Sequence, residues 1–302
     1  MMSRIQMSPN GPEFSQLAYG TWRFLDGGLS AQDVNRRINR CVELGITTID
    51  TAEIYGLYEV EKVLGEALAL SPGLRDQLEL VTKAGIYVPC EYHPERKVAF
   101  YNAMADRLVK SVEKSLRFLN TDHLELFLVH RPDWLTSIDE TAAGLNQLLA
   151  NGKIKSAGVS NYTPSQFQAL NSRMEQPLFT NQVEFHLLHM DPIYDGTFDQ
   201  CQELQVKPMA WSPMAGGKIF DKENEAANRL AEAAIGLSEK YNGATLEQLA
   251  YAWIMAHPSN PLPVIGTNRL ERIDSAAQSV EVELDREDWY ALWTAAKGHG
   301  IP

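Results

Sequence analysis

Cysteine is scarce in this sequence, and the cysteines that are present stand far apart. There are three, Cys41, Cys90 and Cys201, and no two of them form a CxxC pair. An odd number of isolated cysteines excludes a disulfide framework and argues against a zinc knuckle. His186 and His189 follow a strand-like segment, but no third ligand stands at a telling spacing. We therefore expect reduced thiols, no bound metal and a cytoplasmic protein.

Long hydrophobic runs are absent as well. No stretch of about 18 consecutive apolar residues occurs, so the sequence predicts no transmembrane helix. Residues 1–12 contain Arg4, but no apolar run of about seven residues follows it. We therefore expect neither a membrane span nor a signal peptide.

Positive charge is the third scarcity. Lys and Arg together number 27 against 39 Asp and Glu, which gives a net charge of −12. An acidic surface repels phosphate backbones, which argues against a general nucleic-acid or anionic-membrane binder. A small anionic cofactor held by a few local cations remains compatible with this balance. We expect a small-molecule partner, no nucleic acid and no membrane.

What the chain does have is a regular alternation of short apolar strands with amphipathic helices, repeated eight times. Near-continuous apolar strands between helices are typical of a parallel sheet covered on its faces. Eight such units fit a closed (β/α)8 TIM barrel of the α/β class. A doubly wound open sheet is the alternative, but the first strand–helix turn, residues 20–29, lacks the GxGxxG of dinucleotide-binding open sheets. The predicted strands span residues 17–20, 46–49, 78–83, 124–129, 154–159, 178–183, 206–211 and 262–265.

No linker or composition change marks a second domain, so we expect one domain over residues 1–302. Residues before 17 form an N-terminal extension to the barrel, and residues after 281 form a C-terminal tail. The longest loop is expected at 85–97. A helix is expected from about 192 to 204, after the strand at 178–183.

Ionisable side chains stand at the ends of the predicted strands, where the active site of a barrel lies. Asp50 follows the second strand, with Tyr55 shortly after it, while Lys83 ends the third strand and His130 the fourth. Taken singly, each has a structural explanation, such as a helix cap for Asp50 or a core position for Tyr55. Taken together, the four side chains would converge within one barrel mouth.

Such a set would form a proton donor whose pKa is adjusted by its charged neighbours. The Lys83 ammonium would favour phenolate and lower the pKa of Tyr55 from about 10, while Asp50 holds the ammonium charged. Tyr55 would then protonate a carbonyl oxygen that is hydrogen-bonded by His130. This chemistry requires a separate hydride donor. A Schiff-base lyase using Lys83 is an alternative, but it needs a lowered lysine pKa, which Asp50 opposes.

Residues 45–56 read GITTIDTAEIYG and resemble the signature of the aldo-keto reductase family. The resemblance covers about residues 17 to 277, with its motifs in the family's order. A bacterial branch of predicted oxidoreductases shares two further strings, KPMAWS at 207–212 and GPEFS at 11–15. The other motifs are LVHRP at 128–132, GKIK at 152–155, GVSN at 158–161, NQVE at 181–184, WSPMAGG at 211–217 and PVIGT at 263–267.

The resemblance implies a monomeric (β/α)8 barrel that binds extended NADPH without a Rossmann fold and reduces aldehydes or ketones to alcohols. It implies Tyr55 as the proton donor, Lys83 and Asp50 as the groups that tune it, and His130 as the group that orients the carbonyl. A second reading is an NADPH-binding sensor or regulatory subunit with little turnover.

The resemblance also implies a set of NADP(H) contacts. Ser160, Asn161 and Gln182 would hold the nicotinamide carboxamide, and Trp211 would stack on the nicotinamide ring. Small residues after Trp211 would wrap the pyrophosphate with backbone N–H groups. The remaining implied contacts are Gly20, Thr21, Ser212, Met214, Gly216, Gly217, Gly266, Thr267, Asn268 and Arg272.

Residues after the eighth strand bear on the choice between NADP and NAD. Arg272 offers a planar fork suited to the 2′-phosphate, whereas Arg269 is expected to face solvent. The sequence departs from the family at Gly266, where many members have Lys. It departs again at Ser275 and Ala276, where many have Glu and Asn.

Overall fold

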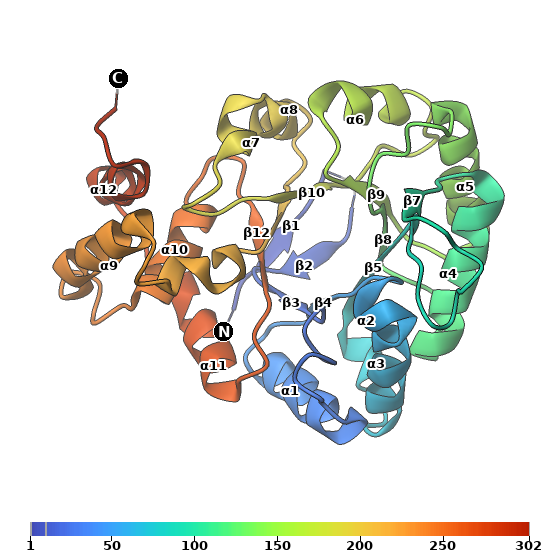
Figure 1. Cartoon of the computed structure of the whole chain (residues 1–302), viewed down its shortest axis with the longest axis horizontal. Helices are drawn as coiled ribbons and strands as arrows, with labels where there is room; N and C mark the ends of the chain where they lie inside the picture. The colour runs from blue at the N-terminus through green and yellow to red at the C-terminus, as the bar shows by residue number, and fades with distance from the viewer. Residues whose placement is uncertain (1, 10, 302) are drawn as a thin grey trace.

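The alternating strands and helices close into a barrel. A computed structural model describes residues 2–9 and 11–301. Eight parallel strands pair in the order β10-β11-β12-β3-β4-β5-β8-β9, and β9 pairs with β10 to complete the ring. Helices surround the ring (Figure 1), which confirms the predicted (β/α)8 fold. The barrel strands are β3 (Ala18–Gly20), β4 (Thr48–Asp50), β5 (Glu79–Ala84), β8 (Leu126–Val129), β9 (Ala157–Ser160), β10 (Asn181–Glu184), β11 (Met209–Trp211) and β12 (Leu262–Ile265).

Capping side chains mark where several helices begin. Ser30, Thr163 and Thr245 each accept a hydrogen bond from the third backbone N–H of the following helix, as part of a capping box. The α-helices are α1 (Ala31–Glu43), α2 (Tyr55–Tyr58), α3 (Val60–Ala69), α4 (Ala105–Leu119), α5 (Ile138–Ala150), α6 (Pro164–Asn171), α7 (Asp191–Tyr194), α8 (Thr197–Glu203), α9 (Glu225–Ser238), α10 (Leu246–Met255), α11 (Leu270–Gln278) and α12 (Arg286–Lys297).

The N-terminal extension is a hairpin that covers the floor of the barrel. Strand β1 (Arg4–Gln6) pairs antiparallel with β2 (Glu13–Ser15). Met7 and Phe14 are fully buried in the cluster of apolar side chains inside the barrel. Ser15 bonds Thr48 at the start of β4, so the hairpin lies at the amino ends of the strands. The hairpin leaves the opposite end of the barrel, at the carboxyl ends of the strands, uncovered.

The C-terminal tail forms α12, which packs against α9 outside the ring of helices (Figure 1). Met1, Asn10 and Pro302, which the one-domain prediction over residues 1–302 includes, lie outside the described residues. That prediction stays a prediction.

The predicted helix over 192–204 is wrong, because two short helices, α7 and α8, replace it. Gly196 between them adopts a left-handed backbone with φ 87°, which an α-helix interior does not allow. The Asp195 side chain then accepts a hydrogen bond from the Thr197 N–H at 2.8 Å and starts the second helix. The loop predicted over 85–97 contains a strand, β6 (Ile86–Tyr87), which pairs with β7 (Phe100–Tyr101).

One carboxyl group is buried between the barrel and its helices, away from the mouth. Glu61 on α3 accepts hydrogen bonds from Thr82 Oγ1 at 2.5 Å and from Ser115 Oγ at 2.8 Å. Burial raises the pKa of Glu61 to about 7, although the two hydroxyl donors and Lys114 favour the charged form and Glu53 opposes it. Folding therefore favours the protonated carboxyl relative to the unfolded chain.

This carboxyl makes stability fall as the pH rises. The protonated Glu61 carboxyl contributes on the order of 3 kcal/mol to the free energy of unfolding. This contribution is fully present below about pH 4.5 and is lost by about pH 7. Glu61→Gln resembles the protonated form, so we expect it to raise the free energy of unfolding at pH 8 and to change it little at pH 4.5. Denaturant titrations at both pH values measure this. Glu66→Gln, at an exposed position on the same helix, is the control. The prediction would be contradicted if the free energy of unfolding changed equally between pH 4.5 and pH 8 in wild type and in Glu61→Gln.

Candidate active site

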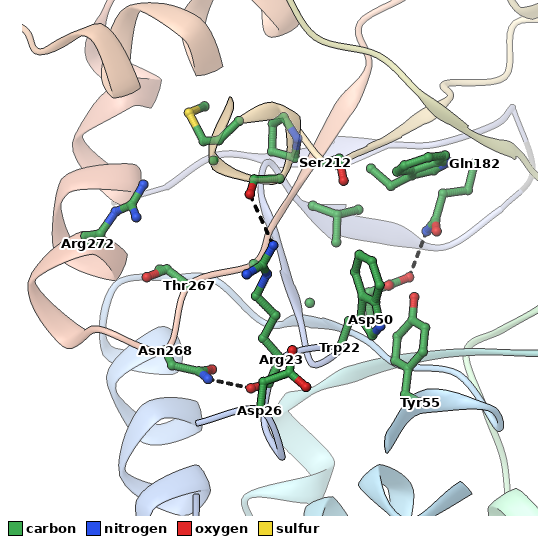
Figure 2. A pocket seen from close by; sticks show the side chains of 18 of the residues that line it. Trp22, Arg23, Asp26, Asp50, Tyr55, Gln182, Ser212, Thr267, Asn268 and Arg272 are labelled. Carbon is green, nitrogen blue, oxygen red and sulfur yellow. Dashed lines mark hydrogen bonds between the residues drawn. The ribbon is translucent and has the colours of Figure 1, made fainter. Parts of the chain in front are cut away.

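A pocket of about 660 Å³ opens at the carboxyl ends of the strands. All but two of the residues predicted to bind or react line it. The exceptions are Lys83, which lies directly beneath it, and Thr21, which is fully buried behind its wall. Figure 2 shows Tyr55 and Asp50 at one end of this pocket and Arg272 at the other. The predicted residues that line it are Gly20, Asp50, Tyr55, His130, Ser160, Asn161, Gln182, Trp211, Ser212, Met214, Gly216, Gly217, Gly266, Thr267, Asn268 and Arg272.

Lys83 is the centre of the predicted catalytic set. Its Nζ donates to Asp50 Oδ2 at 2.7 Å, to the Thr51 carbonyl at 2.8 Å and to Tyr55 Oη at 3.2 Å. Asp50 and Lys83 meet because they end neighbouring strands, β4 and β5. Gln182 donates to the other Asp50 oxygen at 2.7 Å, so both oxygens of this buried carboxylate are bonded.

The charges of this cluster set the protonation of the lysine. Burial alone would lower the pKa of Lys83, but the Asp50 carboxylate and the Tyr55 hydroxyl outweigh burial and raise it. The lysine therefore stays an ammonium ion. A Schiff-base nucleophile needs the opposite shift, a lowered lysine pKa.

The pKa of Tyr55 departs from the sequence-based expectation. Loss of hydration around the phenol raises its pKa above 10, and the attraction of Lys83 offsets this only in part. The predicted lowering by Lys83 is present as a contribution, but the predicted net direction is wrong. The Tyr55 phenol is consequently neutral at physiological pH.

His130 directly follows β8, with its ring edge-on to Tyr55 at a centroid distance of 6.0 Å. Burial, followed by the charges of Lys83 and Arg131, lowers its pKa well below 6.5, so the imidazole is neutral. Its Nδ1 is buried without a hydrogen-bond partner among the described residues.

The residues predicted around the nicotinamide form a hydrogen-bonded chain of their own. Ser160 donates to the Gln182 carbonyl at 2.9 Å, and Asn161 donates to Ser160 Oγ at 2.7 Å. Trp211 Nε1 donates to Asn161 Oδ1 at 3.0 Å. The indole is therefore fixed at the pocket wall by the residue at the end of β9.

Three loops meet around the middle of the pocket. Gly216 and Gly217 adopt positive φ values of 65° and 101°, so the chain after β11 turns tightly at the pocket. Arg23, in the loop after β3, donates to the Gly216 carbonyl at 3.3 Å (Figure 2). Asn268, after β12, donates to the Arg23 carbonyl at 2.6 Å. Sequence reasoning missed Arg23, for which a basic residue in the long first loop is the available signal.

Arg272 lines the far end of the pocket, but its guanidinium already pairs with the Glu247 carboxylate. Its Nη2 donates to Glu247 Oε1 at 2.8 Å, and its Nε lies 3.1 and 3.2 Å from the two carboxylate oxygens. Arg269 pairs with Glu271 and is mostly exposed, as predicted, although it also lines the rim of the pocket. Glu247 was not predicted, because nothing in its spacing signals a partner 25 residues away.

Other lining residues that sequence reasoning missed are Asp26 and Arg131. Arg131 lies next to His130, and its guanidinium stands 5.9 Å from the Trp211 ring. Among the described residues, no three His, Cys, Asp or Glu side chains gather as metal ligands. Within the same residues, no helix is long and apolar enough to cross a membrane.

Comparison with known proteins agrees with this architecture. The model of the aldo/keto reductase family matches residues 16–296. The oxidoreductase YdhF of Escherichia coli is 41% identical over 302 residues, which is 100% of both chains. A 6-dehydroglucose reductase of Agrobacterium fabrum is 43% identical and covers 99% of this chain and 100% of its own.

Among solved structures, the glycerol dehydrogenase AKR11B4 from Gluconobacter oxydans superimposes with a TM-score of 0.86 at 25% identity. The match covers 98% of this chain and 95% of that one. The same fold, the same order of motifs and full-length relatives thus coincide. The chain belongs to the aldo/keto reductase family.

Proposed function

We propose that this protein is an NADPH-dependent oxidoreductase that reduces aldehydes or ketones to alcohols, with Tyr55 as the proton donor. The observation that carries the proposal is the bonding of the Lys83 ammonium to both Asp50 and Tyr55 beneath the pocket. A neutral phenol beside a fixed positive charge can release a proton and have its phenolate stabilised. Membership of the family supports carbonyl reduction in general.

The other catalytic residues have separate tasks. Asp50 keeps the lysine charged, and Gln182 holds the second Asp50 oxygen so that the ion pair keeps one geometry. The neutral His130 ring can donate a hydrogen bond to a carbonyl oxygen without carrying a competing charge. The nicotinamide coenzyme, when bound, supplies the hydride.

The pocket fits an extended dinucleotide. Its volume of about 660 Å³ runs from Tyr55 to Arg272, and its middle is lined by glycines. A side-chain Cβ at Gly217 or Gly266 would meet no atom within 4 Å, so open space lies against the backbone at both positions. In this proposal Ser160, Asn161, Gln182 and Trp211 hold the nicotinamide. The remaining contacts are Gly20, Ser212, Met214, Gly216, Gly217, Gly266, Thr267, Asn268 and Arg272. Thr21 is left out of this set, because it is fully buried and does not line the pocket.

Relatives suggest where to look for the substrate. Two of them, 43% and 35% identical, carry the name 6-dehydroglucose reductase. Arg131 forms no hydrogen bond or ion pair within the described part of the chain and lines the pocket close to Tyr55 and His130. A free guanidinium there can bind an oxygen-rich substrate. A dehydrogenated sugar is therefore the first carbonyl compound to test.

Coenzyme oxidation tests the proposal. Purified protein is mixed with NADPH, and in parallel with NADH, over a panel of dehydro-sugars, other aldehydes, diketones and quinones. We expect turnover of at least one carbonyl at a useful rate. Tight NADPH binding with no turnover over the panel would favour the sensor alternative, and borohydride trapping of substrate on Lys83 would favour the lyase. A monomeric, cytoplasmic protein stays a prediction.

A further inference from the structure

The ion pair at the far end of the pocket is built rigidly. Glu247 is the second residue of α10, and Arg272 lies in the first turn of α11. Two nitrogens of the guanidinium donate to the carboxylate, at 2.8 to 3.2 Å. The Phe220 ring lies 5.3 Å from the guanidinium carbon and limits its movement. The carboxylate side chain is only 11% exposed, yet both charged residues line the pocket.

We propose that Glu247 is a specificity-determining residue that weakens the preference of this site for a 2′-phosphorylated coenzyme. The inference rests on the proposed function, because it takes Arg272 as the group nearest the 2′-phosphate. It goes further by assigning to an acidic side chain a role opposed to that of the arginine.

Two physical effects act in the same direction. First, a carboxylate that accepts from Nε and Nη2 occupies one of the two bidentate edges of the guanidinium, so a phosphate can use only the edge formed by Nη1 and Nη2. Second, the carboxylate cancels the charge of Arg272 and repels a phosphate dianion directly. At an effective dielectric constant of about 20, repulsion over several ångströms amounts to roughly a tenfold change in affinity or more. A ribose with a free 2′-hydroxyl experiences neither effect.

The experiment compares dissociation constants rather than turnover. NADPH and NADH are titrated into wild type and Glu247→Gln, with binding followed by calorimetry or tryptophan quenching. The amide keeps the shape of the side chain and one acceptor for Arg272, but it removes the charge. We expect the Kd for NADPH to fall about tenfold and the Kd for NADH to change less than twofold.

Glu287→Gln is the matched control. Glu287 is the second residue of α12, so both substitutions remove the same favourable interaction with a helix N-terminus. Glu287 is exposed and does not line the pocket. We expect the ratio of the two dissociation constants to stay within twofold of wild type in this variant.

The outcomes separate the two proposals. If wild type binds neither coenzyme, the proposed function fails and this inference with it. If wild type binds NADPH but Glu247→Gln leaves the ratio unchanged, or weakens NADPH alone, the inference fails while the proposed function stands. An equal shift in Glu287→Gln would also overturn it. Glu247→Ala replaces the glutamine variant if that variant does not fold, with the same expected direction, because the ratio cancels damage common to both coenzymes.

Discussion

Tyr55→Phe is expected to lower kcat roughly 10²- to 10⁴-fold while leaving the Kd for NADPH within a factor of about two. The substitution removes one oxygen atom, the acceptor that Lys83 contacts at 3.2 Å and the proposed source of the proton. It leaves the ring in place, so the pocket keeps its shape. Coenzyme oxidation measures the first effect, and fluorescence titration measures the second.

Tyr87→Phe is the control for this prediction. Tyr87 also carries a hydroxyl close to another side chain, Ser111 Oγ at 3.4 Å, but it does not line the pocket. Its substitution is expected to leave kcat within about a factor of two. A Tyr55→Phe protein that reduces carbonyls at the wild-type rate would show that the proton comes from another group.

Lys83→Met is expected to have the largest effect on stability and to abolish measurable turnover. The ammonium is fully buried and is the counter-ion of Asp50, which is almost as deeply buried. Removal of one partner leaves an uncompensated carboxylate in the core, which costs roughly 3–5 kcal/mol. This is a large part of the free energy of unfolding of a typical domain, about 5–15 kcal/mol. Denaturant titration measures the loss.

The double variant Asp50→Leu/Lys83→Met separates stability from chemistry. Replacement of both charges by apolar side chains removes the unpaired carboxylate, so we expect most of the lost stability to return. Activity is expected to stay absent, because nothing then stabilises a Tyr55 phenolate. If the double variant were less stable than Lys83→Met alone, the buried pair would not be the cause of the loss.

Much of the site was predictable because a parallel barrel brings the strand ends together. Asp50, Lys83 and His130 stand directly at the ends of three strands, so their convergence follows from topology once the strands are recognised. The position of the strand ends does not depend on which residues the loops contain. Arg23 and Glu247 were missed, because each reaches the pocket from a loop or helix start whose direction is set by tertiary packing.

The pKa shifts of the site residues were harder to predict than their positions. The direction in which the pKa of Tyr55 shifts depends on whether loss of hydration exceeds the attraction of Lys83. How deeply the phenol is buried decides this. The N-terminal hairpin was also missed, since strands of three residues are too short to show a period. The break before α8 had a local signal, Asp195 followed by Gly196, within a segment whose apolar spacing otherwise suited one helix.

The ring of strands has a consequence for how the protein is made. Strand β12 pairs with β3, and Tyr19 donates to the Thr267 carbonyl across a separation of 248 residues. On the ribosome, β3 emerges early and keeps one edge unpaired until nearly the whole chain has followed. An open edge is a template for pairing with other chains, so the newly made protein is most exposed to aggregation just before its last strand appears. Closure of the barrel is therefore a late event in biosynthesis, and a chain interrupted before residue 262 would carry most of the fold without the ability to close it.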